Sequence, residues 1–349
     1  MPEHLTYLGR CVQLARQAGS SAFPNPLVGA LIVHQHTIIG EGFHPYAGGP
    51  HAEVVAINSV GDKNLLKASR LYVSLEPCNH YGKTPPCTHL ILEHGIPEVI
   101  IGCQDPNPKV AGQGIARLRQ AGVKVSLAPD PGPFQALNAA FFINQLQQRP
   151  FISLKWAQTA DGFVAARHNG GSLQQVAITG PHARVFVHRL RARHHAIMVG
   201  RRTAQVDNPS LTTRHFYGPS PIRLLLDRQL KLSPQLSMLA DGQPTIVLNA
   251  LKQEQQGALR FLRLSQWTDM AVLMRELYQQ VGICSILVEG GTHLLQQLID
   301  QQVYDEVYCF RAPFSLGKGL PAPKLPLGFF NGPAQHLGKD LLLLKKREG

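Results

Sequence analysis

The feature that most constrains this chain is a set of metal-ligating side chains divided between two short segments. The first segment reads His51-Ala52-Glu53, and the second runs from Cys78 to Cys87. One His and two Cys can give a zinc ion three protein ligands and leave its fourth position open, which is the arrangement of a catalytic site. The fold must therefore bring residues 51, 78 and 87 together around one point.

The order of these residues is typical of zinc-dependent deaminases, with one departure. Such enzymes carry His-x-Glu followed by Pro-Cys-x-x-Cys, and their Glu is a general acid and base that does not bind the metal. Here Pro77 precedes Cys78, but eight residues and not two separate Cys78 from Cys87. We therefore interpret His51, Cys78 and Cys87 as the ligands of a single zinc ion per chain, and Glu53 as the catalytic residue.

Prolines beside two of the ligands predict where helices begin. Pro50 and Pro86 each precede a proposed ligand, and Pro is favoured at the first helical position. We expect helices over 50–59 and 86–94, with the ligands in their first turns. A helix N-terminus carries roughly half a positive charge, which favours a thiolate at Cys87.

A structural zinc site is the alternative interpretation. His80 lies between the two Cys ligands and can complete a set of four with His51, Cys78 and Cys87. Structural sites have four protein ligands, and they seldom need an adjacent uncommitted Glu such as Glu53. The open catalytic site is therefore the favoured hypothesis.

Composition indicates a soluble globular protein of two domains. The chain has 349 residues, of which 44% are hydrophobic and 16% charged. No apolar run approaches the roughly 18 residues that a membrane span needs, and the six Cys are too scattered for a disulfide framework. We expect a cytoplasmic enzyme without a membrane partner. The net charge of +12 suits nucleic acid or phosphorylated small molecules, and because the basic residues form no block we discount nucleic acid.

Strands that alternate with helices predict sheets covered by helices on both faces. In the first half the expected strands cover 28–33, 37–42, 70–75, 98–102 and 123–127; in the second half they cover 151–156, 196–200, 222–227 and 245–249, and a segment over 285–292 completes the pattern. A polar, Gln-rich stretch over 144–149 precedes Pro150 and indicates the boundary. We place a deaminase domain at 1–147 and a second domain at 148–349.

Several segments together resemble one family. They are Pro24-Asn25-Pro26-Leu27-Val28-Gly29, Ala47 to Glu53, Glu76-Pro77-Cys78 to Cys87, and Asp105-Pro106-Asn107-Pro108. The chain resembles the bifunctional riboflavin-biosynthesis deaminase/reductase over nearly its whole length, and the long Cys-to-Cys spacing is that family's form. The resemblance implies a three-layer α/β/α cytidine-deaminase-like domain, followed by a dihydrofolate-reductase-like α/β domain that uses NADPH. It also implies a homo-oligomer, a dimer or a tetramer.

The resemblance further implies functional residues outside the zinc site. Those for the phosphorylated pyrimidine substrate of the deaminase are Asn25, His44, Lys83, Asp105 and Asn107. Those for the cofactor are Thr203, Asp207, Gly291, Thr292, His293, Leu294, Leu295, Gln296 and Gln297, with Arg201 and Arg202 as candidates for its 2′-phosphate. Those for the reductase substrate are Arg191, Leu211, Arg214 and Glu289.

The expected function is deamination of 2,5-diamino-6-ribosylamino-4(3H)-pyrimidinone 5′-phosphate, followed by reduction of its ribosyl group with NADPH. One segment departs from the family's common Ser-x-Trp-Ile-Thr: this chain has Gln175-Val176-Ala177-Ile178-Thr179, so neither Gln175 nor Ala177 is given a role. Two alternatives stay open at this point, a nucleic-acid base deaminase fused to a binding module and a non-enzymatic scaffold stabilised by zinc.

Overall fold

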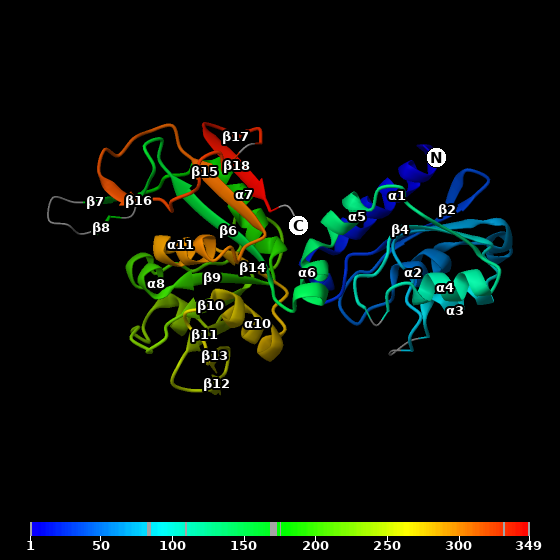
Figure 1. The fold of residues 1–349 in the computed structure, drawn as a ribbon, viewed down its shortest axis with the longest axis horizontal. Coiled ribbons are helices and arrows are strands. Elements are labelled where there is room, and N and C mark those ends of the chain that lie inside the picture. The colour runs from blue at the N-terminus through cyan, green and yellow to red at the C-terminus, as the bar shows by residue number, and fades with distance from the viewer. Residues whose placement is uncertain are drawn as a thin grey trace. The chain divides into compact units, whose positions relative to one another are not determined.

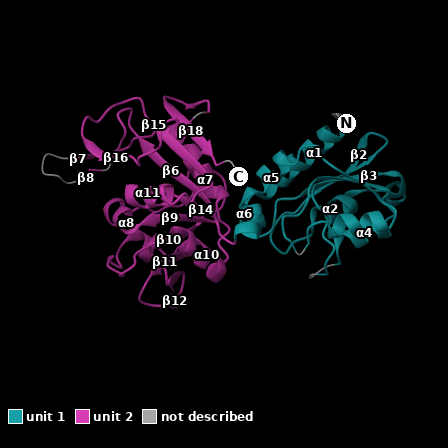
Figure 2. Cartoon of the chain, in the orientation of Figure 1, with its two compact units in different colours: residues 1–147 teal, residues 148–349 magenta. Residues whose placement is uncertain are grey.

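The chain folds into two compact units, residues 1–147 and 148–349 (Figure 2). The structure is a computed structural model, and it describes residues 2–81, 85–108, 110–167, 173–174, 176–330 and 332–347. Within these ranges no helix has both the length and the apolar character required to cross a membrane.

The first unit is built from five strands and six α-helices within the described ranges (Figure 1). The strands are β1 (Gly29–His34), β2 (Thr37–Phe43), β3 (Arg70–Leu75), β4 (Glu98–Cys103) and β5 (Lys124–Leu127). The helices are α1 (Pro2–Ala15), α2 (Ala52–Ser59), α3 (Cys87–Glu93), α4 (Gln113–Gln120), α5 (Gly132–Leu137) and α6 (Ala139–Gln147), with 3₁₀ turns at Arg16–Ala22 and Lys63–Ala68.

These strands form one mixed sheet in the order β2-β1-β3-β4-β5. β1 runs antiparallel to β2 and β3, whereas β3, β4 and β5 are parallel. Alternate residues of each strand face opposite sides, so Ile32 packs with α2, α3 and α4 while Leu31 packs with α1, α5 and α6. This arrangement is the expected three-layer α/β/α domain.

Helix α2 lies unusually close to strand β2. A Cβ atom at Gly42 would lie 2.4 Å from the backbone nitrogen of Ala56 and 2.6 Å from the carbonyl oxygen of Ala52. Only glycine permits this approach, which sets how near the start of α2, and with it His51, comes to the sheet.

The second unit has a larger sheet and five α-helices within the described ranges. Its strands are β6 (Phe151–Gln158), β7 (Phe163–Arg167), β8 (Leu173–Gln174), β9 (Ala196–Gly200), β10 (Ile222–Leu226), β11 (Thr245–Asn249), β12 (Glu254–Gln256), β13 (Leu259–Arg263), β14 (Ser285–Val288), β15 (Glu306–Arg311), β16 (Gly319–Pro321), β17 (Gln335–Leu337) and β18 (Asp340–Lys346). Its helices are α7 (Pro181–Arg193), α8 (Arg201–Asp207), α9 (Ser237–Ala240), α10 (Met270–Val281) and α11 (Thr292–Asp300).

Ten of these strands form one sheet in the order β12-β13-β11-β10-β9-β14-β6-β15-β18-β17. The seven strands from β13 to β15 in that order are parallel, and each outer strand pairs antiparallel with its neighbour: β12 with β13, β18 with β15, and β17 with β18. Helices α10 and α11 pack on one face, and α7, α8 and α9 pack on the other. The carboxyl ends of β9 and β14 lie side by side, which is where an α/β sheet commonly binds a ligand.

Candidate active sites

The three proposed zinc ligands each come from the start of a helix or the end of a strand. Cys78 follows β3 by three residues, and Cys87 is the first residue of α3. His51 is the residue that precedes α2, with an extended backbone at φ −70° and ψ 157°. The two helices therefore begin slightly later than the prolines indicate, because His51 and Pro86 both keep extended conformations outside the helix.

The fold brings these side chains together. Their ligand atoms all lie within 4.8 Å of one another. Nδ1 of His51 is 3.2 Å from Sγ of Cys87 and 3.5 Å from Sγ of Cys78. One imidazole nitrogen and two sulfurs are donors that zinc binds readily. Because His80 is exposed and does not join the cluster within the described ranges, the site offers zinc three protein ligands and has no fourth, as the catalytic interpretation requires.

Protons are shared unevenly between the two thiols. Hydrogen bonding to Cys87, and then to His51, lowers the pKa of Cys78 to about 4. The same bond to Cys78, together with burial, raises the pKa of Cys87.

Glu53 lies beside the cluster without belonging to it. It sits in the first turn of α2 and is only 4% exposed. Burial, followed by the charge of Cys78, raises the pKa of Glu53 to about 7. A carboxyl group in such surroundings can exchange a proton near neutral pH, as a general acid and base must.

His44 and Asn25 form a hydrogen-bonded pair next to His51. Nδ1 of His44 donates to the carbonyl oxygen of Pro50 (2.9 Å), so Nε2 of His44 accepts from Nδ2 of Asn25 (3.0 Å). The rings of His44 and His51 meet edge to face with centroids 5.8 Å apart. Burial lowers the pKa of His44, which keeps it neutral, and the pair has a fixed orientation towards the zinc cluster.

Asp105 and Asn107 lie in the loop that follows β4. The backbone nitrogen of Asn107 donates to Oδ1 of Asp105 (2.8 Å), and both residues are half-buried. Burial raises the pKa of Asp105. Lys83, the remaining residue predicted for this substrate, lies outside the described residues.

The predicted cofactor residues meet at the ends of β9 and β14. Thr203, in the first turn of α8, packs on the turn that follows β14: a Cβ atom at Gly290 would lie 2.9 Å from Cγ2 of Thr203, and one at Gly291 would lie 3.2 Å from its Oγ1. Gly291 has φ 79° and directly precedes α11. Because it has no side chain, a ligand can approach the N-terminus of this helix closely. Such a turn suits an anionic group.

The predicted cofactor residues of α11 differ in which of their atoms are available to a cofactor. Leu294 and Leu295 point into the hydrophobic core, so only their backbone is available to a cofactor. Gln296 is bonded to Asp300 and to the backbone of Lys324, and His293 is exposed. Asp207, at the end of α8, is half-buried, and burial raises its pKa.

A buried ion-pair cluster lies directly beside this turn. Glu289 accepts from Nε and Nη2 of Arg191 at 2.7 and 2.9 Å, and from Nζ of Lys155 at 3.3 Å. Burial alone would raise the pKa of Glu289, but the two cations hold it at about 2. Sequence reasoning predicted Arg191 and Glu289 and missed Lys155, which carries no motif signal within its strand.

The loop after α8 carries Leu211 and Arg214 to the same place. Nη1 of Arg191 donates to the carbonyl oxygen of Thr212 (3.0 Å), and the backbone nitrogen of Arg214 donates to Nδ1 of His188 (2.9 Å). Leu211 is buried with φ 54°, a conformation that costs energy in a non-glycine residue. The loop is therefore held in one shape by helix α7. Gln175 and residues 168–172 lie outside the described residues.

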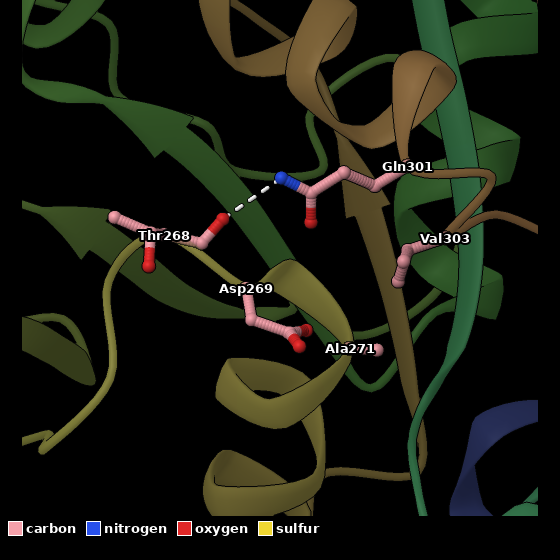
Figure 3. Close-up of a pocket in the computed structure, with 5 residues that line it drawn as sticks. All are labelled: Thr268, Asp269, Ala271, Gln301 and Val303. Carbon is pink, nitrogen blue, oxygen red and sulfur yellow. Dashed lines mark hydrogen bonds between the residues drawn. The ribbon is translucent and has the colours of Figure 1, made fainter.

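A hollow elsewhere in the second unit contains none of the predicted site residues. It is lined by Thr268, Asp269, Ala271, Gln301 and Val303 (Figure 3). Asp269 caps α10, and Gln301 bonds to the backbone of Thr268 and Met270. These polar groups serve the local fold, and we assign the hollow no function.

Comparisons with known proteins agree with this division of sites. Residues 1–103 match the cytidine and deoxycytidylate deaminase zinc-binding region, and residues 150–328 match the RibD C-terminal domain. The riboflavin biosynthesis protein RibD of Synechocystis is 40% identical over 93% of this chain and 88% of its own. The RibD protein of Escherichia coli is 36% identical over 89% of this chain and 88% of its own. The chain belongs to the RibD family.

Solved structures show the same architecture over the full length. A diaminohydroxyphosphoribosylaminopyrimidine deaminase/5-amino-6-(5-phosphoribosylamino)uracil reductase from Thermotoga maritima is 34% identical, with a TM-score of 0.88 and 99% of each chain covered. RibD of Acinetobacter baumannii has a TM-score of 0.87, 29% identity and 98% of each chain covered. The chain is thus a bifunctional enzyme of riboflavin biosynthesis, with a zinc-dependent deaminase and an NADPH-dependent reductase, and its substrate is a small pyrimidine. The cytidine-deaminase-like and dihydrofolate-reductase-like folds are confirmed.

Proposed function

We propose that unit 1 deaminates 2,5-diamino-6-ribosylamino-4(3H)-pyrimidinone 5′-phosphate and that unit 2 reduces the ribosyl group of the product to ribityl. The observation that carries this proposal is the convergence of His51, Cys78 and Cys87 beside the buried Glu53. The name of the Thermotoga relative, which covers 99% of each chain, supports the choice of substrates.

In the deaminase site, His51, Cys78 and Cys87 would hold the metal. A bound zinc ion supplies Lewis-acid activation of water at neutral pH. Glu53, buried beside the cluster, would accept a proton from the attacking water and pass it to the departing amine. Because His44 receives the amide N–H of Asn25, the amide oxygen of Asn25 is left to accept from the pyrimidine.

In the reductase site, Thr203, Asp207 and the segment from Gly291 to Gln297 would hold NADPH. The cofactor supplies the hydride. Arg214 and Leu211 would contact the phosphoribosyl group, and Arg191 would orient it while also fixing the loop through Thr212. Glu289 keeps the two neighbouring cations, Lys155 and Arg191, at defined positions facing the substrate.

Other features fit the proposal. The net charge of +12 suits a phosphorylated substrate. None of the six cysteines forms a disulfide, which agrees with a reducing cytoplasm. Asp105 and Asn107 complete the deaminase substrate site in this proposal, Lys83 remains a prediction for its phosphate, and a dimer or tetramer remains a prediction that light scattering can check.

Assaying the two half-reactions separately tests the function. Purified enzyme should convert the diaminopyrimidine phosphate with an ultraviolet change in the absence of NADPH. Adding NADPH afterwards should produce stoichiometric NADPH oxidation. Absence of the first change, with zinc present, would contradict the proposed substrate, and NADPH oxidation without prior deamination would contradict the order.

A further inference from the structure

Glu76 is a buried carboxylate that has no part in the chemistry described above. It follows β3 directly, precedes Pro77 and Cys78, and is 5% exposed. No cation among the described residues lies within ion-pair distance of it, in contrast to the buried Glu289. Among the described residues its oxygens accept from three backbone N–H groups: Oε2 from Asp105 (3.3 Å) and Gly112 (2.9 Å), and Oε1 from Ile115 (3.1 Å).

These three N–H groups mark the two ends of one loop. Asp105 lies just after β4, whereas Gly112 precedes α4 and Ile115 is in its first turn. The first N–H groups of a helix need partners from outside the helix, and Gly112 has no side chain to provide one. The carboxylate of Glu76 therefore caps α4 from a distant strand, and its negative charge suits the helix N-terminus.

The start of α4 also packs closely on the segment that leads from β3 to the zinc ligand Cys78. A Cβ atom at Gly114 would lie 2.1 Å from the carbonyl oxygen of Pro77, the residue before Cys78. The loop between the two anchors carries Asp105 and Asn107, and Oδ1 of Asp105 accepts from the backbone of Asn107. A continuous series of hydrogen bonds thus runs from Glu76 through Asp105 to Asn107.

We propose that Glu76 is a positioning residue of the deaminase. It fixes the loop that carries Asp105 and Asn107 at a set distance from the end of β3, and so aligns the pyrimidine with the zinc cluster. This inference rests on the proposed function, since it takes Asp105 and Asn107 as substrate contacts.

Glu76→Gln is the decisive variant because an amide has the shape of the carboxylate but only one acceptor oxygen. Whichever way the amide turns, its NH₂ group faces a backbone donor, so at least one of the three hydrogen bonds is lost, and the negative charge at the start of α4 is lost with it. Glu76→Ala removes all three bonds, and if that variant does not fold, Glu76→Gln still decides. Asp130→Asn is the matched control: Asp130 also accepts a backbone N–H, from Gly132 (2.8 Å), in the same unit but away from the predicted site residues.

The experiment measures zinc content, deaminase KM and kcat, reductase activity, and amide hydrogen exchange over residues 104–116. For Glu76→Gln we expect one zinc per chain, unchanged reduction, faster exchange of this loop, and a KM for deamination raised by about 10- to 100-fold with kcat little changed, since misplaced positioning groups cost up to roughly 10²-fold. Asp130→Asn should match the wild type in all of these.

Three results would overturn the inference. Unchanged exchange would show that Glu76 does not order the loop, and unchanged KM with faster exchange would show that loop order does not serve binding. Loss of zinc would make Glu76 a support of Cys78 instead. A wild-type enzyme that fails to deaminate this pyrimidine would contradict the proposed function itself, whereas an active wild type with an unaltered KM in the variants contradicts only the role of Glu76.

Discussion

At the scale of single residues, side-chain chemistry predicted the zinc cluster well and the buried ion-pair cluster only in part. His51, Cys78 and Cys87 are recognisable from sequence because few other roles need one His and two Cys with an adjacent Glu. Lys155 is not recognisable, because a Lys within an apolar strand gives no sign that it will face a buried carboxylate such as Glu289.

Replacing Glu289 by Gln should destabilise unit 2 and abolish most reduction. The change leaves Lys155 and Arg191 with side chains only 15% and 12% exposed and without their counter-charge. Breaking a buried ion pair in this way typically costs about 3–5 kcal/mol. Denaturant unfolding measures the loss, and Glu254→Gln is the control, because its pair with Lys252 is exposed to solvent and should contribute little to stability. Equal losses in both variants would refute this account of Glu289.

The His188 contact predicts how the stability of unit 2 depends on pH. Burial, followed by the charge of Arg191, lowers the pKa of His188 to about 4 from its ordinary value of 6.5. His215, Arg214 and Glu289 also face this ring. Protonation of His188 is less favourable in the folded protein than in the unfolded one. The folded state is therefore destabilised as pH falls from 6.5 towards 4, and this loss is absent above pH 6.5.

His188→Asn should weaken that dependence. The amide oxygen of Asn can accept from the backbone of Arg214 as Nδ1 of His188 does, and it does not titrate. The difference in unfolding free energy between the wild type and His188→Asn should therefore shrink as pH falls from 6.5 to 4. Parallel curves over this range would show that His188 does not titrate as its surroundings indicate.

At the scale of elements, the predicted strands are present in both sheets, with ends that differ by at most a few residues. Eight strands of the second unit were not predicted: β7, β8, β12, β13, β15, β16, β17 and β18. The run Leu341 to Leu344 in β18 is continuously apolar, and such a short run has no periodicity that distinguishes strand from helix. Its place beside β15 depends on pairing with distant residues, which local sequence does not encode.

The close packing of α2 on β2 gives a prediction at this scale. Gly42→Ala should push α2 away from the sheet, because the new Cβ would lie 2.4 Å from a backbone atom of α2 that cannot move alone. His51 precedes this helix, so zinc retention and deamination should both fall by about 10-fold or more. Gly9→Ala in α1 is the control, since no atom lies within 4 Å of its Cβ position and Ala stabilises a helix interior by roughly 0.5–1 kcal/mol over Gly. Normal zinc retention in Gly42→Ala would contradict the packing argument.

At the scale of the whole molecule, two compact units each carry one candidate site. In the deaminase, motifs alone predicted the zinc ligands and Glu53, whereas the substrate residues were predicted from resemblance. For the reductase site the prediction depended on resemblance, because Glu289 is distant in the chain from Arg191 and Thr203 and comes near them through the parallel pairing of β9 and β14. The spacing of residues along the chain contains no such information.

Unit 2 should prefer NADPH to NADH. Arg201 and Arg202 are exposed at the start of α8, two and one residues before Thr203, where a guanidinium can contact a 2′-phosphate. Replacing both by Ala should raise KM for NADPH and leave KM for NADH nearly unchanged. Equal efficiency with the two cofactors in the wild type would count against the preference, and deamination should not respond to either change.

The most direct test of the whole account is Glu53→Gln with both activities and zinc measured on the same preparation. If Glu53 moves protons and does not bind metal, this variant should retain one zinc per chain. Deamination should fall by about 10²- to 10⁴-fold, the usual contribution of general acid and base catalysis. Reduction of substrate that has already been deaminated should proceed at close to the wild-type rate, because that site lies in unit 2. Loss of zinc would make Glu53 a ligand or its support, and loss of both activities with zinc retained would show that the two units do not work independently.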